Sequence, residues 1–309
     1  MALRERPLAH LALFIVNFLY GVNYVVAKGL MPAIIGPSGF ILLRVMGASL
    51  LFWILRANRP QRVATTDLGR LLICALFGVA LNQLMFFHGL MRTSPINASI
   101  IMVATPILVL VMAGLLLKER TTWTRVGGVL LGAGGALTLI MLKSPDDGSG
   151  ATALGDLFIL VNAASYAVFL VLVKPLMRKY SAVTVMAWCF LLALPMVAPF
   201  GWSEFHAVNW SQLAVGHWMA MLFVVIMVTF VAYLLNTWAL GMVSPTVVGT
   251  YIYMQPVLAA LATWSFVHLG AERLGIPGNY QASLHLPQLF CAAAIFAGVH
   301  LVSRPERIR

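Results

Sequence analysis

One arginine stands inside a long apolar stretch of this sequence. Arg44 lies about five residues into the stretch 39–55, which contains no acidic residue. Burying a cation in hydrocarbon costs at least about 2.5 kcal/mol, so a partner or a function is expected. A guanidinium binds carboxylate or phosphate through paired, charge-assisted hydrogen bonds. Arg44 therefore predicts attraction of an anionic solute group. The alternatives are that its side chain reaches the membrane interface or binds backbone carbonyls.

Other polar residues gather on single faces of the apolar stretches. Asn17, Tyr20 and Tyr24 are spaced three and four residues apart, which puts them on one face of a helix. Lipid does not tolerate such a face, so we expect it to point at other helices or at a cavity. Similar faces occur in two later stretches, formed by Asn162, Ser165 and Tyr166, and by Thr229, Tyr233 and Asn236.

Together these faces predict a solute-binding cavity between helices near the middle of the membrane. Hydrogen bonding between helices is the alternative explanation for each single residue. The residues predicted to bind the solute are Asn17, Tyr20, Tyr24, Arg44, Gln83, Tyr166, Tyr233 and Gln255.

Two prolines are expected to kink helices at a similar depth in the membrane. Pro106 lies eleven residues beyond Pro95, and Pro256 lies eleven residues beyond Pro245. Eleven residues of helix span about 16 Å, which reaches the middle of the membrane. A proline there removes one backbone hydrogen bond and frees a carbonyl. We predict a hinge or kink at Pro106 and Pro256, with a static kink satisfied by helix packing as the alternative.

The usual catalytic and metal-binding motifs are missing. There is no His-Glu-x-x-His pair, no Gly-x-Ser-x-Gly, no phosphate loop and no cluster of Cys or His with metal spacing. Cys74, Cys189 and Cys291 lie in apolar stretches and suggest no disulfide framework. We expect no enzyme, no metal and no cofactor. An intramembrane enzyme that assembles its site from separate helices is the runner-up.

The elements that must position these residues are membrane-spanning helices. Of 309 residues, 61% are hydrophobic and 9% charged, whereas soluble domains are about 45–50% apolar and about 25% charged. The apolar runs approach the roughly 20 residues that a helix needs to cross a bilayer. They are too long for barrel strands and lack their alternation. We predict an all-α membrane protein with ten transmembrane helices, at 10–28, 39–55, 70–90, 95–117, 125–142, 155–173, 182–200, 217–239, 245–266 and 286–302.

The basic residues indicate topology rather than nucleic-acid binding. The net charge is +11, but the basic residues sit beside hydrophobic runs and form no patch with stacking aromatics. Most of the 20 lysines and arginines fall on one side of the predicted membrane. By the positive-inside rule, that bias places both termini in the cytoplasm.

The two halves of the chain repeat one another. At an offset of 146, Tyr20, Lys28, Leu30 and Met31 recur as Tyr166, Lys174, Leu176 and Met177. At an offset of 150, Leu90, Ser94, Pro95 and Pro106 recur as Leu240, Ser244, Pro245 and Pro256. Each half, 1–150 and 151–309, would hold five helices. Because five is odd, the second copy must enter the membrane from the opposite side. Inverted repeats of this kind are typical of carriers that work by alternating access.

These features resemble the EamA type of the drug/metabolite transporter superfamily over essentially the whole chain. The resemblance rests on 21–28, 40–44, 90–106 and the Glu119-Arg120 pair followed by glycines, with the pattern returning at 240–256 and Glu272-Arg273. One departure is that Pro106 and Glu119 are thirteen residues apart but Pro256 and Glu272 are sixteen. The resemblance implies a metabolite carrier, often an exporter, in the bacterial inner membrane, with amino acids as common solutes.

The predicted function is therefore a multi-pass carrier that moves a small metabolite, such as an amino acid or a similar zwitterionic or anionic compound, by alternating access as an exporter or exchanger. Its expected partners are the small-molecule solute and membrane lipid, and no nucleic acid. A membrane scaffold or receptor is a further, less favoured alternative. All nine acidic residues are expected in loops or at helix ends, which argues against a proton relay through a carboxylate in the membrane.

Overall fold

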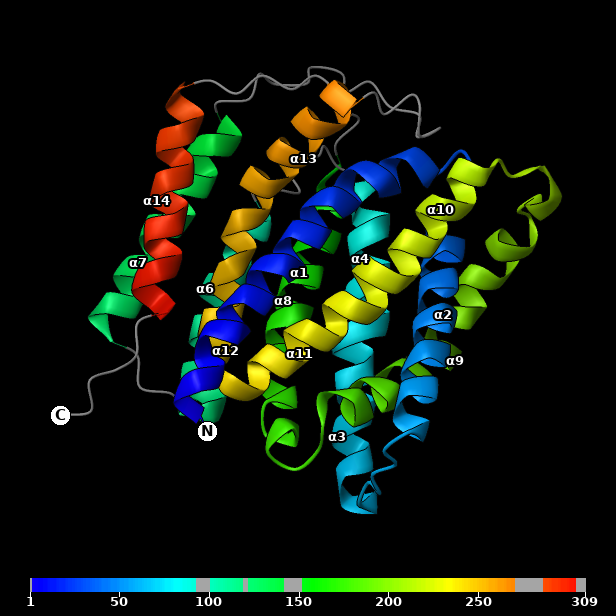
Figure 1. Ribbon diagram of the computed structural model, residues 1–309, viewed down its shortest axis with the longest axis horizontal. Coiled ribbons are helices and arrows are strands. Elements are labelled where there is room, and N and C mark those ends of the chain that lie inside the picture. Colours follow the sequence, from blue (N-terminus) through cyan, green and yellow to red (C-terminus); the bar gives the residue numbers. More distant parts are fainter. Residues whose placement is uncertain (1, 93–100, 119–121, 142–151, 270–285, 304–309) are drawn as a thin grey trace.

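The computed structural model describes residues 2–92, 101–118, 122–141, 152–269 and 286–303, and within these ranges the chain is helical with no strand (Figure 1). The side chains of Tyr24, Lys28 and Pro256 are outside the described part. The elements are α1 (Ala2–Leu30), α2 (Pro37–Ala57), α3 (Thr65–Ala75), η1 (Leu76–Ala80), α4 (Leu81–Leu90), α6 (Ala104–Leu117), α7 (Trp123–Met141), α8 (Ala153–Val173), η2 (Leu176–Arg178), α9 (Ala182–His206), η3 (Trp210–Gln212), α10 (Val215–Phe223), η4 (Val224–Val231), α11 (Ala232–Met242), α12 (Pro245–Thr250), η5 (Tyr251–Met254), α13 (Gln255–Leu269) and α14 (Leu286–Ser303).

The all-helical prediction is confirmed for the described residues. Among them, five continuous helical segments are long and apolar enough to cross a membrane: Pro37–Ala57, Thr65–Leu90, Ala153–Arg178, Ala182–His206 and Val215–Met242. Shorter apolar helices lie at Pro7–Asn23, Ala104–Leu117 and Phe290–Ser303. Helix occupies part of each of the ten predicted ranges, while the count of ten crossings stays a prediction.

The first turns of α1 and the last turn of α14 lie toward the same, lower end of the bundle (Figure 1). This is what an even number of crossings requires. The side of the membrane on which this end lies stays a prediction, made from the basic residues alone.

Local sequence explains where several helices begin. Ser181 and Ser244 cap α9 and α12, since each hydroxyl accepts a hydrogen bond from the backbone N–H three residues later. Pro245 occupies the first position of α12, where its missing N–H does no harm. The Ser-Pro pair at 244–245 therefore starts a helix as its sequence predicts, whereas the equivalent pair at 94–95 lies outside the described residues.

Four of the membrane helices are interrupted. The helix from Thr65 to Leu90 contains the π-helical segment η1, and the helix from Val215 to Met242 contains a second one, η4. The chain from Pro245 onward passes through the 3-10 turn η5 before α13 begins, and α6 begins at Ala104 after a turn at Val103. The predicted ranges 95–117 and 245–266 were expected to be continuous with a kink, and the structure breaks them just before the proline.

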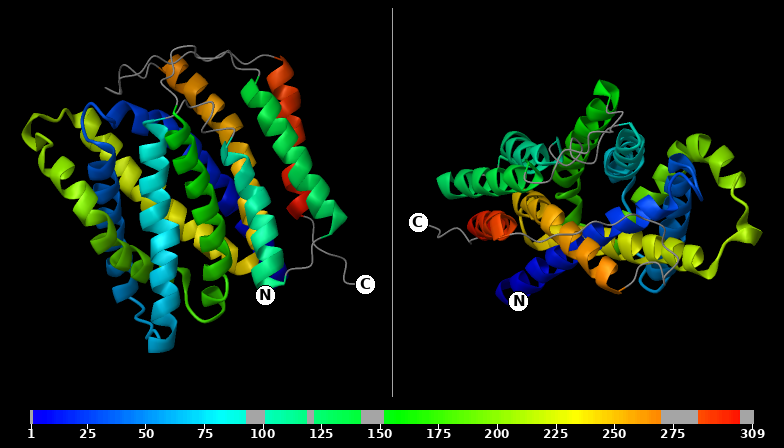
Figure 2. Two further views of the ribbon diagram at one scale, coloured as in Figure 1. Left: turned by 180° about the vertical axis from the view of Figure 1, so that it is seen from behind. Right: turned by 90° about the horizontal axis from the view of Figure 1, so that it is seen from above.

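The helices pack in pairs that match between the two halves. α2 packs along α9, and α7 packs along α14. α1 contacts α11 and α13, while α8 contacts α4 and α6. The α7–α14 pair stands at one edge of the molecule, away from α2 and α9 (Figures 1 and 2). It is held by small residues, because a Cβ added to Gly298 would lie 2.6 Å from the carbonyl oxygen of Gly128.

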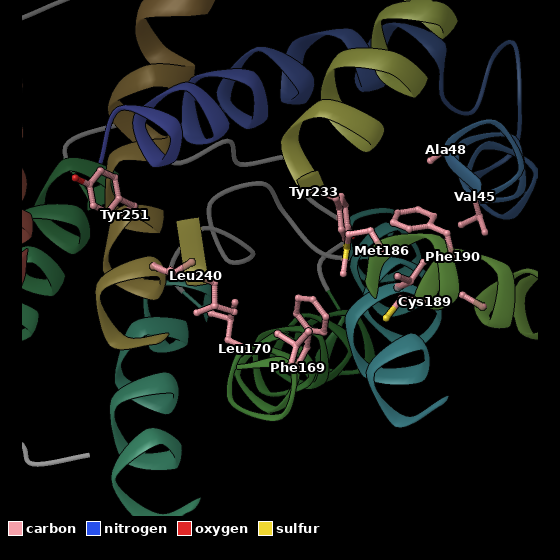
Figure 3. Packing of buried hydrophobic residues seen from close by; sticks show 14 of the residues in the cluster. Val45, Ala48, Phe169, Leu170, Met186, Cys189, Phe190, Tyr233, Leu240 and Tyr251 are labelled. Atoms are coloured by element: carbon pink, nitrogen blue, oxygen red, sulfur yellow. The ribbon is translucent and has the colours of Figure 1, made fainter. Parts of the chain in front are cut away.

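The buried core is apolar and continuous through the middle of the bundle. Phe40, Phe52, Phe169 and Phe190 are fully buried, and Figure 3 shows Phe190 beside Tyr233, which is 5.1 Å from it between ring centres. Large apolar side chains such as Leu115 also cover the outside, where a soluble protein would be polar. An apolar exterior of this kind fits a lipid environment.

Candidate functional site

A cavity of about 110 Å³ lies among α1, α2, α4, α8, α11 and the broken helix from α12 to α13. One buried water needs roughly 10–15 Å³ of such space. The cavity can therefore hold several waters or a small solute.

The structure brings together seven of the eight residues that the sequence predicts to bind a solute. They come from both halves of the chain and all line this cavity: Asn17, Tyr20, Arg44, Gln83, Tyr166, Tyr233 and Gln255. The eighth, Tyr24, has its side chain outside the described part. That these residues bind a solute stays a prediction.

Other lining residues were not predicted. Asn162 and Asn236 belong to polar faces that the spacing had indicated, but they were not assigned to the site. Asn23 and Asn82 carried a usable signal as amides within apolar stretches, next to predicted residues. The apolar lining residues carried none, because an apolar residue in a membrane helix is the rule; they are Val16, Phe86, Phe87, Met102, Val248 and Ile252.

Among the described residues, Arg44 is the only charged one that lines the cavity. Its side chain is 4% exposed, and its Nε donates a hydrogen bond of 2.9 Å to Thr229 Oγ1. Among the described residues Thr229 is its only hydrogen-bond acceptor. The guanidinium carbon also lies 5.1 Å from the ring centre of Phe87 and 5.5 Å from that of Phe40. Aromatic faces stabilise a cation without neutralising it, so the charge remains available to a solute.

The π-helical turn η4 fixes the direction in which Thr229 bonds. Its hydroxyl donates to Val224 O, five residues earlier, at 2.8 Å. With its proton used there, the oxygen can only accept, and it accepts from Arg44 Nε. This contact holds the guanidinium by one edge and leaves its terminal nitrogens for another partner.

Amide and hydroxyl groups form a network around the rest of the cavity. Gln255 Nε2 donates to Asn17 Oδ1 at 2.9 Å, and Asn17 Nδ2 donates to Leu13 O at 2.7 Å. Asn236 Nδ2 donates to Tyr166 Oη at 3.0 Å. The Gln255–Asn17 bond joins the two halves of the chain, and the Asn236–Tyr166 bond joins α11 to α8 within the second half.

Two lining amides keep unused hydrogen-bonding atoms. Nε2 and Oε1 of Gln83 and Oδ1 of Asn23 are buried and have no hydrogen bond of normal geometry among the described residues. Gln83 is 3% and Asn23 9% exposed. An unsatisfied buried polar group costs about 1–3 kcal/mol. Such a cost is expected where a ligand supplies the missing partner.

The two prolines lie beside the cavity. Proline has no N–H, so the carbonyl four residues earlier loses its helical partner; these residues are Met102 and Ile252, and both line the cavity. Ile252 O instead accepts from the N–H of Gln255 across the 3-10 turn. Pro106 itself is buried. A hinge motion at either proline stays a prediction.

Three titratable residues of the described part, His88, Asp67 and Glu204, are not among the residues that line the cavity. His88 Nε2 is 2.7 Å from Ser38 Oγ, near the start of α2. Asp67 lies in the first turn of α3 and pairs with Lys179 at 3.0 Å. Glu204 Oε2 accepts a hydrogen bond of 2.8 Å from the backbone N–H of Gly39. In the part of the chain that the structure describes, no Asp or Glu lines the cavity.

Comparison with known sequences identifies the family. The sequence pattern of the EamA-like transporter family matches residues 7–141 and again 153–274. The chain belongs to the EamA-like transporter family. The resemblance seen in the sequence is thereby confirmed, and the same family pattern covers both halves of this transporter.

Relatives of this EamA-like transporter carry names that agree. A protein of Archaeoglobus fulgidus named "Uncharacterized transporter" is 25% identical over 257 residues, covering 82% of this chain and 86% of the relative. A WAT1-related protein of Arabidopsis thaliana is 23% identical and covers 96% of this chain and 86% of its own. A crystal structure 19% identical in sequence has a TM-score of 0.70 and covers 95% of both chains, which shows a shared fold. The protein is a multi-pass membrane transporter of a small molecule.

Proposed function

We propose that this transporter carries an amino acid or a similar zwitterionic or anionic metabolite by alternating access, as an exporter or exchanger in the bacterial inner membrane. The observation that carries the proposal is the guanidinium of Arg44, which is buried in the cavity wall and is paired with no carboxylate among the described residues. Its terminal N–H groups suit the two oxygens of a carboxylate. The neutral walls leave that charge for the solute to balance.

The rest of the cavity suits the other end of a zwitterion. A solute ammonium has three N–H donors, and Gln83 Oε1 and Asn23 Oδ1 are buried acceptors without a donor among the described residues. Tyr20, Tyr166 and Tyr233 also line the space and offer aromatic faces to a cation. An ammonium needs no carboxylate from the protein here, because its charge is compensated within the solute.

We further propose that residues 1–150 and 151–309 form two inverted repeats, with both termini in the cytoplasm. Two observations support the inverted repeats. The family pattern matches twice, once in each half, and the helix contacts of α1 with α11 and α13 are mirrored by those of α8 with α4 and α6. Two such halves have two near-equivalent arrangements around a central site, which is the basis of alternating access.

The test is solute exchange in liposomes containing the purified protein. We expect saturable exchange of labelled against unlabelled amino acid, and no exchange of amines that lack a carboxylate. Arg44→Gln should weaken binding by about 10- to 100-fold, because a charge-assisted hydrogen bond contributes about 1.5–3 kcal/mol. Equal exchange of amines, or unchanged affinity in a folded Arg44→Gln variant, would contradict the proposal.

Arg56→Gln is the matched control. Arg56 lies on the same helix but outside the cavity, where its Nη2 donates to Gln61 O at 2.8 Å. This variant should keep the affinity of the wild type. Analysis of the recovered solute by mass spectrometry separates a carrier, which returns it unchanged, from an intramembrane enzyme.

A further inference from the structure

Lys174, outside the cavity, ties together two helices that line it. It is the C-terminal cap of α8, and its ammonium donates to the backbone carbonyls at the end of α11. The acceptors are Leu240 O, Val243 O at 2.7 Å and Gly241 O at 3.5 Å. α8 and α11 both belong to the second half, but the helix that each contacts most belongs to the first half: α4 for α8 and α1 for α11.

The acceptors on α11 cannot be satisfied by the helix itself. The N–H of Val243 bonds Ala239 O, and the helix ends at Met242. The residue that would next bond Gly241 O is Pro245, which has no N–H. A lysine ammonium fits this place because the end of a helix carries unpaired carbonyls and a partial negative charge.

This contact joins the two cavity walls formed by α8 and α11 at one end of these helices. Tyr166 lies eight residues before Lys174 on the same helix, a rise of about 12 Å. On the other wall, Tyr233 lies seven residues before Leu240. Leu170 of α8 and Leu240 of α11 belong to one buried cluster (Figure 3), and Leu240 O is one of the acceptors of Lys174. If the walls separate at this end, the Lys174 bonds must break.

The sequence holds a second set of the same parts. Lys28, at the end of α1, is the counterpart of Lys174 at the offset of 146. Leu90 and Met91, at the end of α4, are the counterparts of Leu240 and Gly241 at the offset of 150, and a Ser-Pro pair follows in both halves. The second set belongs to the opposite end of the cavity, since α1 and α4 end toward the upper side of the view, where α8 begins, whereas α11 ends toward the lower side (Figure 1).

We propose that the two lysines are alternating clamps. The Lys174 clamp stabilises the arrangement seen here, in which the ends of α8 and α11 are joined. The Lys28 clamp stabilises the other arrangement by binding the carbonyls at the end of α4. This inference rests on the alternating-access part of the proposed function and not on the identity of the solute.

The test measures the distance across each end by electron paramagnetic resonance of spin-label pairs in lipid nanodiscs. The full-length chain, with its three cysteines replaced by alanine, carries labels at Arg178→Cys and Gly241→Cys, or at Ala33→Cys and Met91→Cys. These four positions are exposed. Lys174→Met should lower the ratio of short to long distances for the 178–241 pair by on the order of tenfold, and raise it for the 33–91 pair. Lys28→Met should do the reverse.

Two further variants keep the result interpretable. Lys174→Arg keeps the donors and should retain the short distance. Lys179→Met removes a nearby lysine that pairs with Asp67 and should shift neither distribution. A single population at both ends in every variant would overturn alternating access and the clamps together. Two populations that Lys174→Met leaves unshifted, or shifts in the same direction as Lys28→Met, would overturn the clamps alone.

Discussion

Two of the interrupted helices that line the cavity contain a π-helical turn, and these two turns differ in what they bind. In η1, between α3 and α4, the carbonyls of Phe77 and Gly78 accept hydrogen bonds from Ser165 and Tyr233 of the other half. In η4, between α10 and α11, a carbonyl is used within the same stretch, by Thr229. π-helical turns disturb the helix ladder and are frequent at functional sites. The first turn therefore anchors neighbouring helices, and the second prepares a side chain.

The side chain that η4 prepares is the one that holds Arg44. At the repeat offsets, Thr229 corresponds to Val79 and Arg44 falls at Phe190, and both of these counterparts are buried and apolar. One half of a symmetric frame thus supplies a polar pair where the other supplies an apolar one. A repeated helix arrangement thus need not give repeated side chains, and under the proposed function we expect a solute to bind in one preferred orientation.

The largest loss of stability is expected from a bulky side chain at Gly78, which lies in η1. A Cβ at Gly78 would lie 2.2 Å from the ring of Phe169, so Gly78→Leu should lower the free energy of unfolding by about 3 kcal/mol. Thermal unfolding in detergent measures this. Gly69→Leu, on the same broken helix with nothing within 4 Å of its Cβ, should change stability little. Equal stability of the two variants would show that η1 is not a tight contact.

A pair of equivalent positions should respond in opposite ways. Gln83 and Tyr233 correspond at the offset of 150. The amide of Gln83 has no hydrogen bond of normal geometry among the described residues, whereas Tyr233 Oη donates to Gly78 O at 3.4 Å. Gln83→Met should stabilise the solute-free protein by about 1–2 kcal/mol while weakening solute binding. Tyr233→Phe should instead reduce stability. Thermal shifts with and without solute test both, and a destabilised Gln83→Met variant would contradict the unsatisfied state of this amide.

The Thr229 contact should affect binding more than folding. Thr229→Val keeps the shape but removes the acceptor for Arg44 Nε, so affinity for a carboxylate solute should fall about tenfold. Thr229→Ser should restore it. Combined with Arg44→Gln, the Val substitution should add little further loss, because both act on one interaction. Additive losses in this double-mutant cycle would mean that Thr229 does not act through Arg44.

The smallest change in stability and affinity is expected from Ser165, whose hydrogen bond anchors α8 to η1. Ser165 donates to Phe77 O, and Ser165→Ala should cost about 1 kcal/mol of stability. Solute affinity should stay within a factor of two or so of the wild type. A large loss of affinity with unchanged stability would move Ser165 from anchoring to binding.

Some of this site was readable from the sequence, and some was not. Asn17, Tyr20 and Tyr233 were found because polar residues at helical spacing mark a face that avoids lipid. Arg44 was found because an unpaired cation in an apolar stretch demands a reason. The aromatic faces of Phe40 and Phe87 against its guanidinium were not, because membrane helices are full of apolar residues.

The helix interruptions were predicted only where proline causes them. Pro106 and Pro256 gave a signal, although the chain breaks slightly earlier, at Val103 and in η5. The turns η1 and η4 gave none. The carbonyls of η1 are bound by Ser165 and Tyr233 from distant parts of the chain, and Thr229 of η4, which bonds Val224 O, also bonds the distant Arg44. Such contacts become visible only once the helices are packed.

The fixed charge of Arg44 in the cavity wall has an electrical consequence. Arg44 belongs to the protein wall, and no described lining residue is acidic. Under the proposed function, a solute that crosses without a coupled ion therefore carries the whole charge that crosses the membrane. A zwitterion would then cross without regard to voltage, while each unit of negative charge would gain or lose about 2.3 kcal/mol per 100 mV. The current carried by reconstituted protein under a clamped potential would thus report the ionic form of the cargo, before its chemical name is known.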